Sequence, residues 1–319
     1  MHAAVAEDLR RRHHLRVADL SIDTVHQAHL MPTFLQAGTD VHGSHGLFYW
    51  LRARCRGRIV AAARAATVLT WRPDVQRMVA LRPVGQLDAV IDILDAAART
   101  ADAETGGAPF VARYCADELA ARLRDRGWID MTTPWQPGIP ADDETYPEVI
   151  VTAPVADIPH GQRYRPVREA ITRHSRRYTY TASPTPRRIG EAELITHGAA
   201  RATDYDGHEM DFNTAVLAAM DSAHHDWLTY HYLIHGERLA GFAITANITG
   251  MSHGYYLSTH DAPRLTAYFL WSIYLQQRRS GAFALNLGGS ETASLHQFKM
   301  HTFPEHVLQH TAVLQHPGQ

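Results

Sequence analysis

Residues 251–288, MSHGYYLSTHDAPRLTAYFLWSIYLQQRRSGAFALNLG, carry the pattern that decides the fold. A β-rich run at 251–260 is followed by apolar residues at helical spacing over 263–280. A second short apolar run follows at 282–288 and ends in glycine. The segment therefore predicts a unit of strand, long helix and strand, which is typical of α/β proteins.

The same order of elements occurs in the first half of the chain. There the corresponding runs are 77–83, 86–104 and 108–115. In both halves a hairpin signal precedes these elements, with turns expected at Gly57 and at Gly236. In both halves a shorter helix and a closing strand follow. The two halves are thus expected to contain one supersecondary order twice.

The spacing of matching residues supports a tandem repeat. Gly57 and Gly236 are 236 − 57 = 179 residues apart, and Trp128 and Phe303 are 303 − 128 = 175 residues apart. We expect an N-terminal domain over 1–155, largely structural, and a catalytic domain over 164–319. A proline-containing linker separates them, and the first 20 residues are expected to be partly loose.

This element order resembles the GNAT acyltransferase fold. The resemblance implies fold class α/β (α+β), with two tandem GNAT-like domains, each a mixed, mostly antiparallel sheet flanked by helices. It also implies that strands 251–260 and 282–288 splay apart and that the acyl group lies in the V between them. Four side chains near that cleft are substrate-binding candidates, although tyrosines in sheets more often serve the core: Tyr232, Tyr256, Ser258 and Asp261.

Composition excludes several classes of protein. The 319 residues carry a formal net charge of −2, which argues against non-specific wrapping of nucleic acid. No apolar run approaches the ~20 residues that span a bilayer, so we expect no membrane partner. The N-terminus lacks a signal peptide and the two cysteines form no CxxC pair, which favours the cytoplasm.

The densest polar cluster is ALNLGGSETASLHQFKMHTFP, residues 284–304. A strand that ends in glycines and leads into a helix N-terminus exposes backbone donors, which can stabilise an oxyanion. Lys299 is the only lysine, whereas the chain has thirty arginines. This suggests a position whose role an arginine side chain cannot fulfil. The alternative is a glycine turn with a serine cap and a helix-terminal lysine. The catalytic candidates are Lys299, Glu291, Asn286 and Ser290.

No cofactor loop is evident. GNAT enzymes hold coenzyme A with an RxxGxG-type loop, but the corresponding segment of the second half has no glycine and carries Asp261. The first half has Arg82 and Gly85 at that place, a weak half-match. We therefore expect no coenzyme A. We also expect no metal, because His231 and His235 are about 13 Å apart along a strand.

An arginine-rich run, RYRPVREAITRHSRRYTY, occupies residues 163–180. If 166–177 is helical, its guanidiniums lie near one face and can bind phosphates, while its tyrosines can stack on unpaired bases. A solvated surface helix is the alternative. The candidate tRNA-binding residues are Arg165, Arg168, Arg173, Arg176 and Arg177.

The segment with Phe298-Lys299 and Phe303-Pro304 resembles the FK…F signature of Fem-type peptidoglycan aminoacyltransferases. It is also similar to the C-terminal domain of phosphatidylglycerol lysyltransferases, and DDETYPE at 142–148 looks like the same broader group. Both groups are tandem GNAT folds that take the acyl group from aminoacyl-tRNA. The resemblance implies that Lys299 faces the transferred carbonyl and that Phe298 packs near the tRNA 3′ end.

These observations lead to one expected function and two alternatives. We expect an aminoacyltransferase that moves an amino acid from aminoacyl-tRNA to the amine or hydroxylamine of a small soluble acceptor. Among such enzymes, the chain most resembles the soluble valanimycin-type seryltransferases of natural-product pathways. Partners would be the tRNA acceptor end, a small amine and, as a candidate, an aminoacyl-tRNA synthetase. The alternatives are an acyl-CoA-dependent N-acyltransferase and a non-catalytic GNAT-like binding protein.

Overall fold

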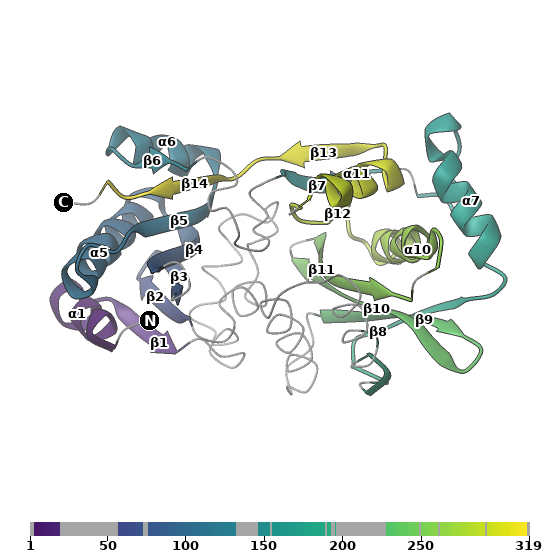
Figure 1. The fold of residues 1–319 in the computed structure, drawn as a ribbon, viewed down its shortest axis with the longest axis horizontal. Helices are drawn as coiled ribbons and strands as arrows, with labels where there is room; N and C mark the ends of the chain where they lie inside the picture. The colour runs from purple at the N-terminus through teal and green to yellow at the C-terminus, as the bar shows by residue number, and fades with distance from the viewer. Residues whose placement is uncertain are drawn as a thin grey trace. The chain divides into compact units, whose positions relative to one another are not determined.

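The chain forms two compact units, which a computed structural model shows in Figure 1. The structure describes residues 3–19, 57–72, 76–131, 146–153, 155–188, 190–192, 195, 228–248, 250–260, 262–290 and 292–317, without the side chains of Ala3, Arg82 and Ile248. The first unit comprises Met1–Thr145 with His310–Gln319, and the second comprises Tyr146–Gln309.

The first unit is built on a seven-stranded mixed sheet of order β1-β2-β3-β4-β5-β14-β6. Its helices are α1 (Ala3–His13), α5 (Leu87–Thr105) and α6 (Asp117–Asp125). Its strands are β1 (Arg16–Asp19), β2 (Arg58–Ala62), β3 (Ala65–Arg72), β4 (Arg77–Gly85), β5 (Phe110–Cys115), β6 (Ile129–Asp130) and β14 (Ala312–Gln315). Among these strands only β4 and β5 pair in parallel, and α5 connects them.

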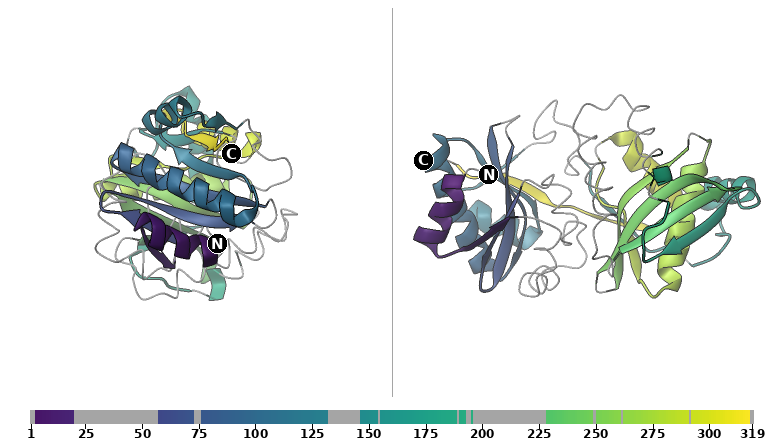
Figure 2. Two further views of the ribbon diagram at one scale, coloured as in Figure 1. Left: turned by 90° about the vertical axis from the view of Figure 1, so that its left-hand side faces the viewer. Right: turned by 90° about the horizontal axis from the view of Figure 1, so that it is seen from below.

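One face of this sheet carries the core of the first unit. The apolar stripe of α5 supplies Ile91 and Leu94, which are fully buried against the sheet. Val5 and Leu9 of α1 join the same cluster, and Figure 2 shows α1 beside α5 on that face. The expectation of a loose N-terminus is therefore wrong for residues 3–19, because their apolar side chains pack into the core.

The second unit repeats this plan. Its seven-stranded sheet has the order β13-β7-β12-β11-β10-β9-β8. The strands are β7 (Glu148–Val151), β8 (Thr179–Ser183), β9 (Leu228–His235), β10 (Arg238–Ile248), β11 (Met251–Thr259), β12 (Ala284–Asn286) and β13 (His306–Gln309). The helices are α7 (Arg165–His174), α10 (Leu265–Arg279) and α11 (Ala293–Thr302), with a 3₁₀ turn η2 at Gln162–Tyr164. β11 and β12 are parallel and α10 connects them, so the expected fold class is confirmed in both units.

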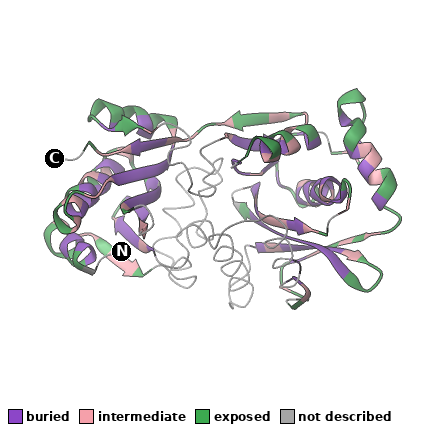
Figure 3. Cartoon of the chain, in the orientation of Figure 1, coloured by how far each residue is buried: buried purple, intermediate pink, exposed green. Residues whose placement is uncertain are grey.

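Helix α10 is buried on nearly all sides. It packs against α7 and against strands β8, β11 and β12, and Figure 3 shows it as a largely buried element. Trp271 and Tyr274 of α10 pack on the ring of Phe303, which is fully buried. Trp128 has the matching place in the first unit, against Phe110. Among the described residues, no helix combines the length and the apolar character that crossing a bilayer requires.

The order of elements repeats as expected, but one of the two glycines used to align the halves does not lie in the hairpin turn. In the second unit β9 and β10 form the expected hairpin, with Gly236 in the turn at φ +60°. In the first unit Gly57 only precedes β2, and the turn between β2 and β3 lies at Ala63-Arg64. This two-residue turn forms without glycine, so the glycine signal pointed to the wrong place. The hairpin offset becomes 236 − 63 = 173.

The two units exchange one strand each. β7 follows the first unit in sequence but pairs with β12 and β13 of the second sheet. β14 follows the second unit in sequence but pairs with β5 and β6 of the first sheet. The units therefore differ from the expected domains 1–155 and 164–319 at both ends, since residues 146–155 lie with the second unit and residues 310–319 with the first.

Candidate acyl-transfer site

The two parallel strands of the second unit separate soon after they meet. β11 pairs with β12 only from Met251 to His253, opposite residues 284–286. Beyond that point β11 continues to Thr259 beside β10 alone. A bulge at Tyr255, where the register with β10 shifts, increases the local bend. The sheet thus opens where β12 ends, which is the V that the GNAT resemblance implies.

A glycine turn occupies the end of β12 and is fixed by β7. Leu287 N donates to Val149 O at 2.9 Å, and Val149 N donates to Gly288 O at 3.2 Å. Asn286, fully buried, accepts a 2.8 Å hydrogen bond from Gly288 N through its Oδ1. Ser290 N donates to Tyr146 O at 3.4 Å. The N–H groups of Leu287, Gly288 and Ser290 are therefore already engaged by acceptors within the unit, which differs from the expected set of exposed oxyanion donors.

The ammonium of Lys299 lies against the carbonyl side of this turn. Lys299 is 8% exposed, and its Nζ donates to Leu287 O at 2.9 Å, to Gly288 O at 3.2 Å and to Gly289 O. An ammonium has three N–H donors, so three converging carbonyls match it. A planar guanidinium cannot place one nitrogen at that point in the same way. The geometry gives a physical reason for lysine here in a chain whose other cations are arginine.

Helix α11 returns Lys299 to the turn from which the helix started. Its N-cap is Thr292, whose side chain accepts from Leu295 N at 3.2 Å, so the serine cap of the alternative interpretation is wrong. Ser290 is fully buried in the turn, and its Oγ has no hydrogen-bond partner among the described residues. Phe298 is half-buried against the core of the unit. Glu291 lies outside the described residues.

Two residues that the sequence analysis quoted only within the segment 142–148, and not as site candidates, border this turn. Tyr146, in an isolated bridge with Ser290, stacks its ring on His296 with centroids 5.1 Å apart. Burial and the charge of Lys299 lower the pKa of His296, so its neutral form is favoured. Glu148 is 2% exposed and accepts a 2.9 Å hydrogen bond from Asn286 Nδ2. The available signal for Glu148 was an acid at the start of the apolar run EVIV.

The other substrate-binding candidates lie along the central strands. Tyr232 is buried, and its hydroxyl accepts from Arg187 N at 2.6 Å, so this hydroxyl has a structural partner. Tyr256 is half-buried, with its ring 6.0 Å from that of Phe242, and Ser258 is 7% exposed. Asp261 lies outside the described residues. The turn and these side chains belong to one sheet, but only the turn brings several polar candidates together.

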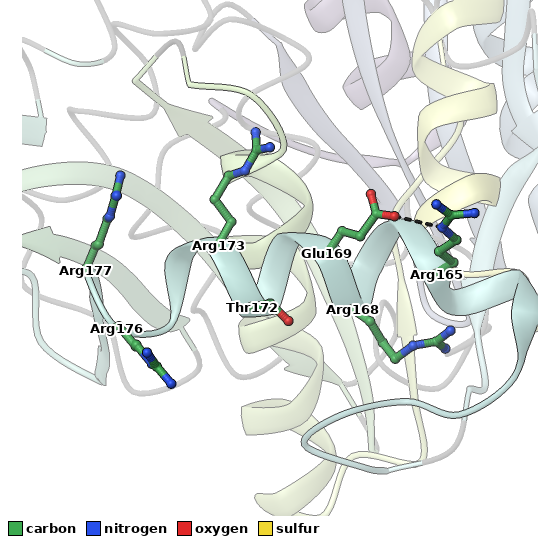
Figure 4. A pocket seen from close by; sticks show the side chains of 7 residues that line it. All are labelled: Arg165, Arg168, Glu169, Thr172, Arg173, Arg176 and Arg177. Carbon is green, nitrogen blue, oxygen red and sulfur yellow. Dashed lines mark hydrogen bonds and ion pairs between the residues drawn. The ribbon is translucent and has the colours of Figure 1, made fainter.

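The arginine run forms the outer face of α7. The helix ends at His174, three residues before the expected end, and a turn follows at residues 175–177. Val167 and Ala170 on the inner face are buried. The outer face lines an open hollow, and in Figure 4 side chains reach along both sides of the helix. The lining residues are Arg165, Arg168, Glu169, Thr172, Arg173, Arg176 and Arg177.

The arginines of this face differ in what they contact. Arg165 pairs with Glu169 at 2.8 Å, and Arg264 pairs with the other oxygen of that carboxylate. Arg168 donates to the carbonyls of Pro159 and Gly161. Three further arginines are exposed, and their side chains form no hydrogen bond or ion pair with a described residue. They are Arg173, Arg176 and Arg177. These three charges remain available to an anionic partner.

The described residues before α5 and α10 form contacts within the protein at the places where GNAT enzymes have their phosphate loop. Gly85 belongs to β4, and a Cβ there would meet Arg64 O at 2.2 Å, so close strand pairing explains this glycine. In the second unit α10 follows Arg264, which is itself in the left-handed region at φ +66°. The carbonyl of Pro263 accepts from His174 Nε2 at 2.9 Å. Both glycine-loop positions therefore serve contacts within the protein.

The described residues contain no group of three or more His, Cys, Asp or Glu side chains placed to hold a metal ion. His231 is fully buried between Tyr180 OH at 2.7 Å and Thr245 Oγ1 at 2.8 Å. Burial lowers the pKa of His231 to about 3. This histidine is a neutral core residue that links strands β8, β9 and β10.

No protein-family model matches the chain, and a search of curated proteins finds no match. Solved structures do share its fold. L-PGS from Bacillus licheniformis is similar with a TM-score of 0.64 at 13% identity, over 93% of this chain and 92% of that one. FemX gives 0.59 at 12% identity, over 94% and 96%. A tandem GNAT protein from the clavulanic acid biosynthesis pathway gives 0.52 at 9% identity, over 95% and 98%.

These similarities cover nearly the whole length of each chain. At such low identity they establish the fold, and they confirm the resemblance to Fem-type and GNAT-like proteins at that level. The chain thus has a tandem GNAT-like fold.

Proposed function

We propose that the protein is an aminoacyltransferase that takes an amino acid from aminoacyl-tRNA and passes it to a small amine or hydroxylamine. One observation carries the proposal. The only lysine of the chain is buried and fixed by three carbonyls at the point where β11 and β12 part. A positive charge held there in a low-dielectric setting can stabilise the oxyanion that forms when an amine attacks an ester.

Three observations support aminoacyl-tRNA as the donor of the amino acid. The place of the coenzyme A loop has no glycine, and the carbonyl before α10 serves an internal hydrogen bond. L-PGS and FemX, which share the fold, belong to the groups that the Phe298-Lys299 segment resembles, and those groups use aminoacyl-tRNA. Arg173 on α7, together with Arg176 and Arg177 in the turn after it, offers sites for phosphates of such a donor.

The chemistry requires little more than alignment, because the donor ester is already activated. The attacking amine adds to the ester carbonyl, and the tRNA ribose hydroxyl leaves as the amide forms. Lys299 provides positive charge near the oxyanion. Asn286 shapes the turn, and the buried Ser290 hydroxyl is free to accept or donate to a bound group. Glu291 or Asp261 would hold the ammonium of the amino acid or accept a proton. We propose no metal and no coenzyme A.

A reconstituted assay tests this function. It contains a synthetase, its amino acid, ATP, tRNA and a panel of small amines, and mass spectrometry detects the aminoacylated product. Product should form only with charged tRNA and should disappear after ribonuclease treatment. Product that survives ribonuclease would remove the tRNA donor from consideration. Calorimetric titration with acetyl-CoA tests the alternative donor, and micromolar binding with turnover of an amine would favour it.

A further inference from the structure

The buried carboxylate of Glu148 has a defined relation to Lys299. Glu148 accepts from Asn286 Nδ2 at 2.9 Å, and Asn286 Oδ1 accepts from Gly288 N at 2.8 Å. Gly288 O in turn accepts from Lys299 Nζ at 3.2 Å. Both Glu148 and Asn286 are at most 2% exposed. A continuous chain of buried hydrogen bonds therefore joins the carboxylate to the ammonium.

The direction of this chain is fixed by chemistry. A backbone N–H can only donate, so the Asn286 oxygen must face Gly288. The amide NH₂ group then faces Glu148, and a carboxylate is an acceptor that suits it. Any other orientation of the Asn286 amide would set two donors against each other. Glu148 thereby selects the Asn286 orientation in which the turn is held.

The turn carries this constraint to Lys299. Leu287, Gly288 and Gly289 follow Asn286 directly, and their three carbonyls hold the ammonium. If the Asn286 oxygen no longer holds Gly288 N, two glycines leave the turn with wide conformational freedom. The three carbonyl oxygens then no longer converge on one position. The position of the charge depends on a side chain contributed by β7, a strand outside the strand–helix–strand unit.

We propose that Glu148 is a positioning residue, which acts through Asn286 and the glycine turn to hold the Lys299 ammonium at the site. The step at the reaction centre rests on the function proposed above. The positioning itself does not rest on it, because it concerns contacts within the protein. Glu148 touches no reacting atom in this scheme.

An exchange of the two polar partners tests the proposal. In Asn286→Asp the new carboxylate faces that of Glu148, and the donor between them is lost. In the double variant Glu148→Gln with Asn286→Asp, the side-chain amide introduced at position 148 can donate to the new carboxylate, whose other oxygen still accepts from Gly288 N. The hydrogen-bond chain is restored with its net charge unchanged. Glu148→Gln alone keeps an acceptor for Asn286 and should behave nearly as wild type.

The lone lysine provides a readout that needs no substrate. Reductive methylation with formaldehyde and a borohydride modifies only Lys299 and the N-terminal amine, and peptide mass spectrometry separates the two. Losing one buried hydrogen bond shifts local opening about tenfold. Asn286→Asp should therefore raise the methylation rate of Lys299 about tenfold, and the double variant should return it close to wild type. Asn247→Asp makes the same change at an exposed turn, where Oδ1 accepts from Gly250 N, and should have no effect.

Transfer activity is measured on the same variants. Misplacing the ammonium should lower kcat about 10²-fold in Asn286→Asp with little change in KM, and the double variant should recover most of this loss. If Asn286→Asp does not fold, Glu148→Met removes the acceptor in its place and should also raise Lys299 methylation.

Unchanged methylation in the folded single variant, or no recovery in the double variant, overturns the positioning role. A loss of activity in Glu148→Gln alone, with Lys299 still protected, also overturns it, because it would mean that Glu148 acts directly. If methylation follows the expected pattern while no aminoacyl-tRNA is used, the positioning role stands and the proposed function fails.

Discussion

Three carbonyl oxygens converge on the Lys299 ammonium, and this geometry separates lysine from arginine at the scale of one residue. Lys299→Ala should lower kcat by about 10²–10³, because the positive charge held near the oxyanion is lost. It should also destabilise the unit by about 1–3 kcal/mol, because buried carbonyls lose their partner. Single-turnover kinetics and urea unfolding measure the two effects.

Lys299→Arg should also lower kcat, since a planar guanidinium cannot place one nitrogen where the three carbonyl oxygens converge. His301→Ala serves as the control, because His301 is an exposed basic residue in the same turn of α11. Near-normal kinetics in both Lys299 variants would mean that the lysine has no part in the chemistry.

His231 predicts a pH dependence of stability. Its pKa is lowered from 6.5 to about 3 by burial, so between these values the unfolded chain takes up a proton that the folded chain refuses. Stability therefore falls as pH drops below 6.5, by about 2 kcal/mol between pH 7.5 and pH 5. His231→Gln should lose this component in urea unfolding measured across that range. His235→Gln, on the exposed end of the same strand, should keep it, and parallel curves for wild type and His231→Gln would contradict the prediction.

The sequence singled out Lys299 and Asn286 as candidates, whereas Glu148 was quoted only as part of the segment 142–148, and the reason is physical. A single lysine and a polar residue at the end of an apolar run can both be recognised in the sequence itself. The partner of Asn286 lies 138 residues away, and only strand pairing brings it near. The alternative interpretation of the same segment placed a serine cap on α11, where Thr292, two residues later, has the extended backbone that a cap requires.

At the scale of one element, α7 presents its inner face to α10 and its charged face to solvent. Arg176→Glu with Arg177→Glu should raise the KM for aminoacyl-tRNA more than it changes kcat, because these side chains meet the donor far from the reacting atoms. Each lost phosphate contact should reduce the salt slope of binding by about 0.7–0.9. Arg11→Glu with Arg99→Glu makes the same charge change on exposed helix positions of the first unit. Equal loss of affinity in both pairs would indicate a general charge effect.

The order of elements was predictable because apolar periodicity specifies each helix and strand locally. The hairpin in the first unit was misplaced because a turn at Ala63-Arg64 carries no glycine. The strand exchange was not predictable either. β7 and β14 are short apolar runs of four residues, and nothing in such a run specifies which of two similar sheets it joins.

At the scale of the whole molecule, the exchange makes the last strand a structural part of the first unit. β14 lies between β5 and β6, and His316 packs its ring on Trp128 with centroids 5.2 Å apart. A chain that ends at Gln309 should leave the first sheet open and its core unstable. Hydrogen exchange should then show lost protection in α5 and β5, with protection kept in α10 and β9. A chain that ends at His316 is the control, and unchanged protection of α5 in the shorter chain would refute the prediction.

The exchanged strands also set the order in which a newly made chain can finish folding. During synthesis, residues 146–309 leave the ribosome with every strand of their sheet present, including β7. The first unit emerges earlier but lacks β14 until residue 315 has been added. It must wait with the β5 edge exposed, where another strand could pair. The half of the protein that is made first is therefore the half that is completed last.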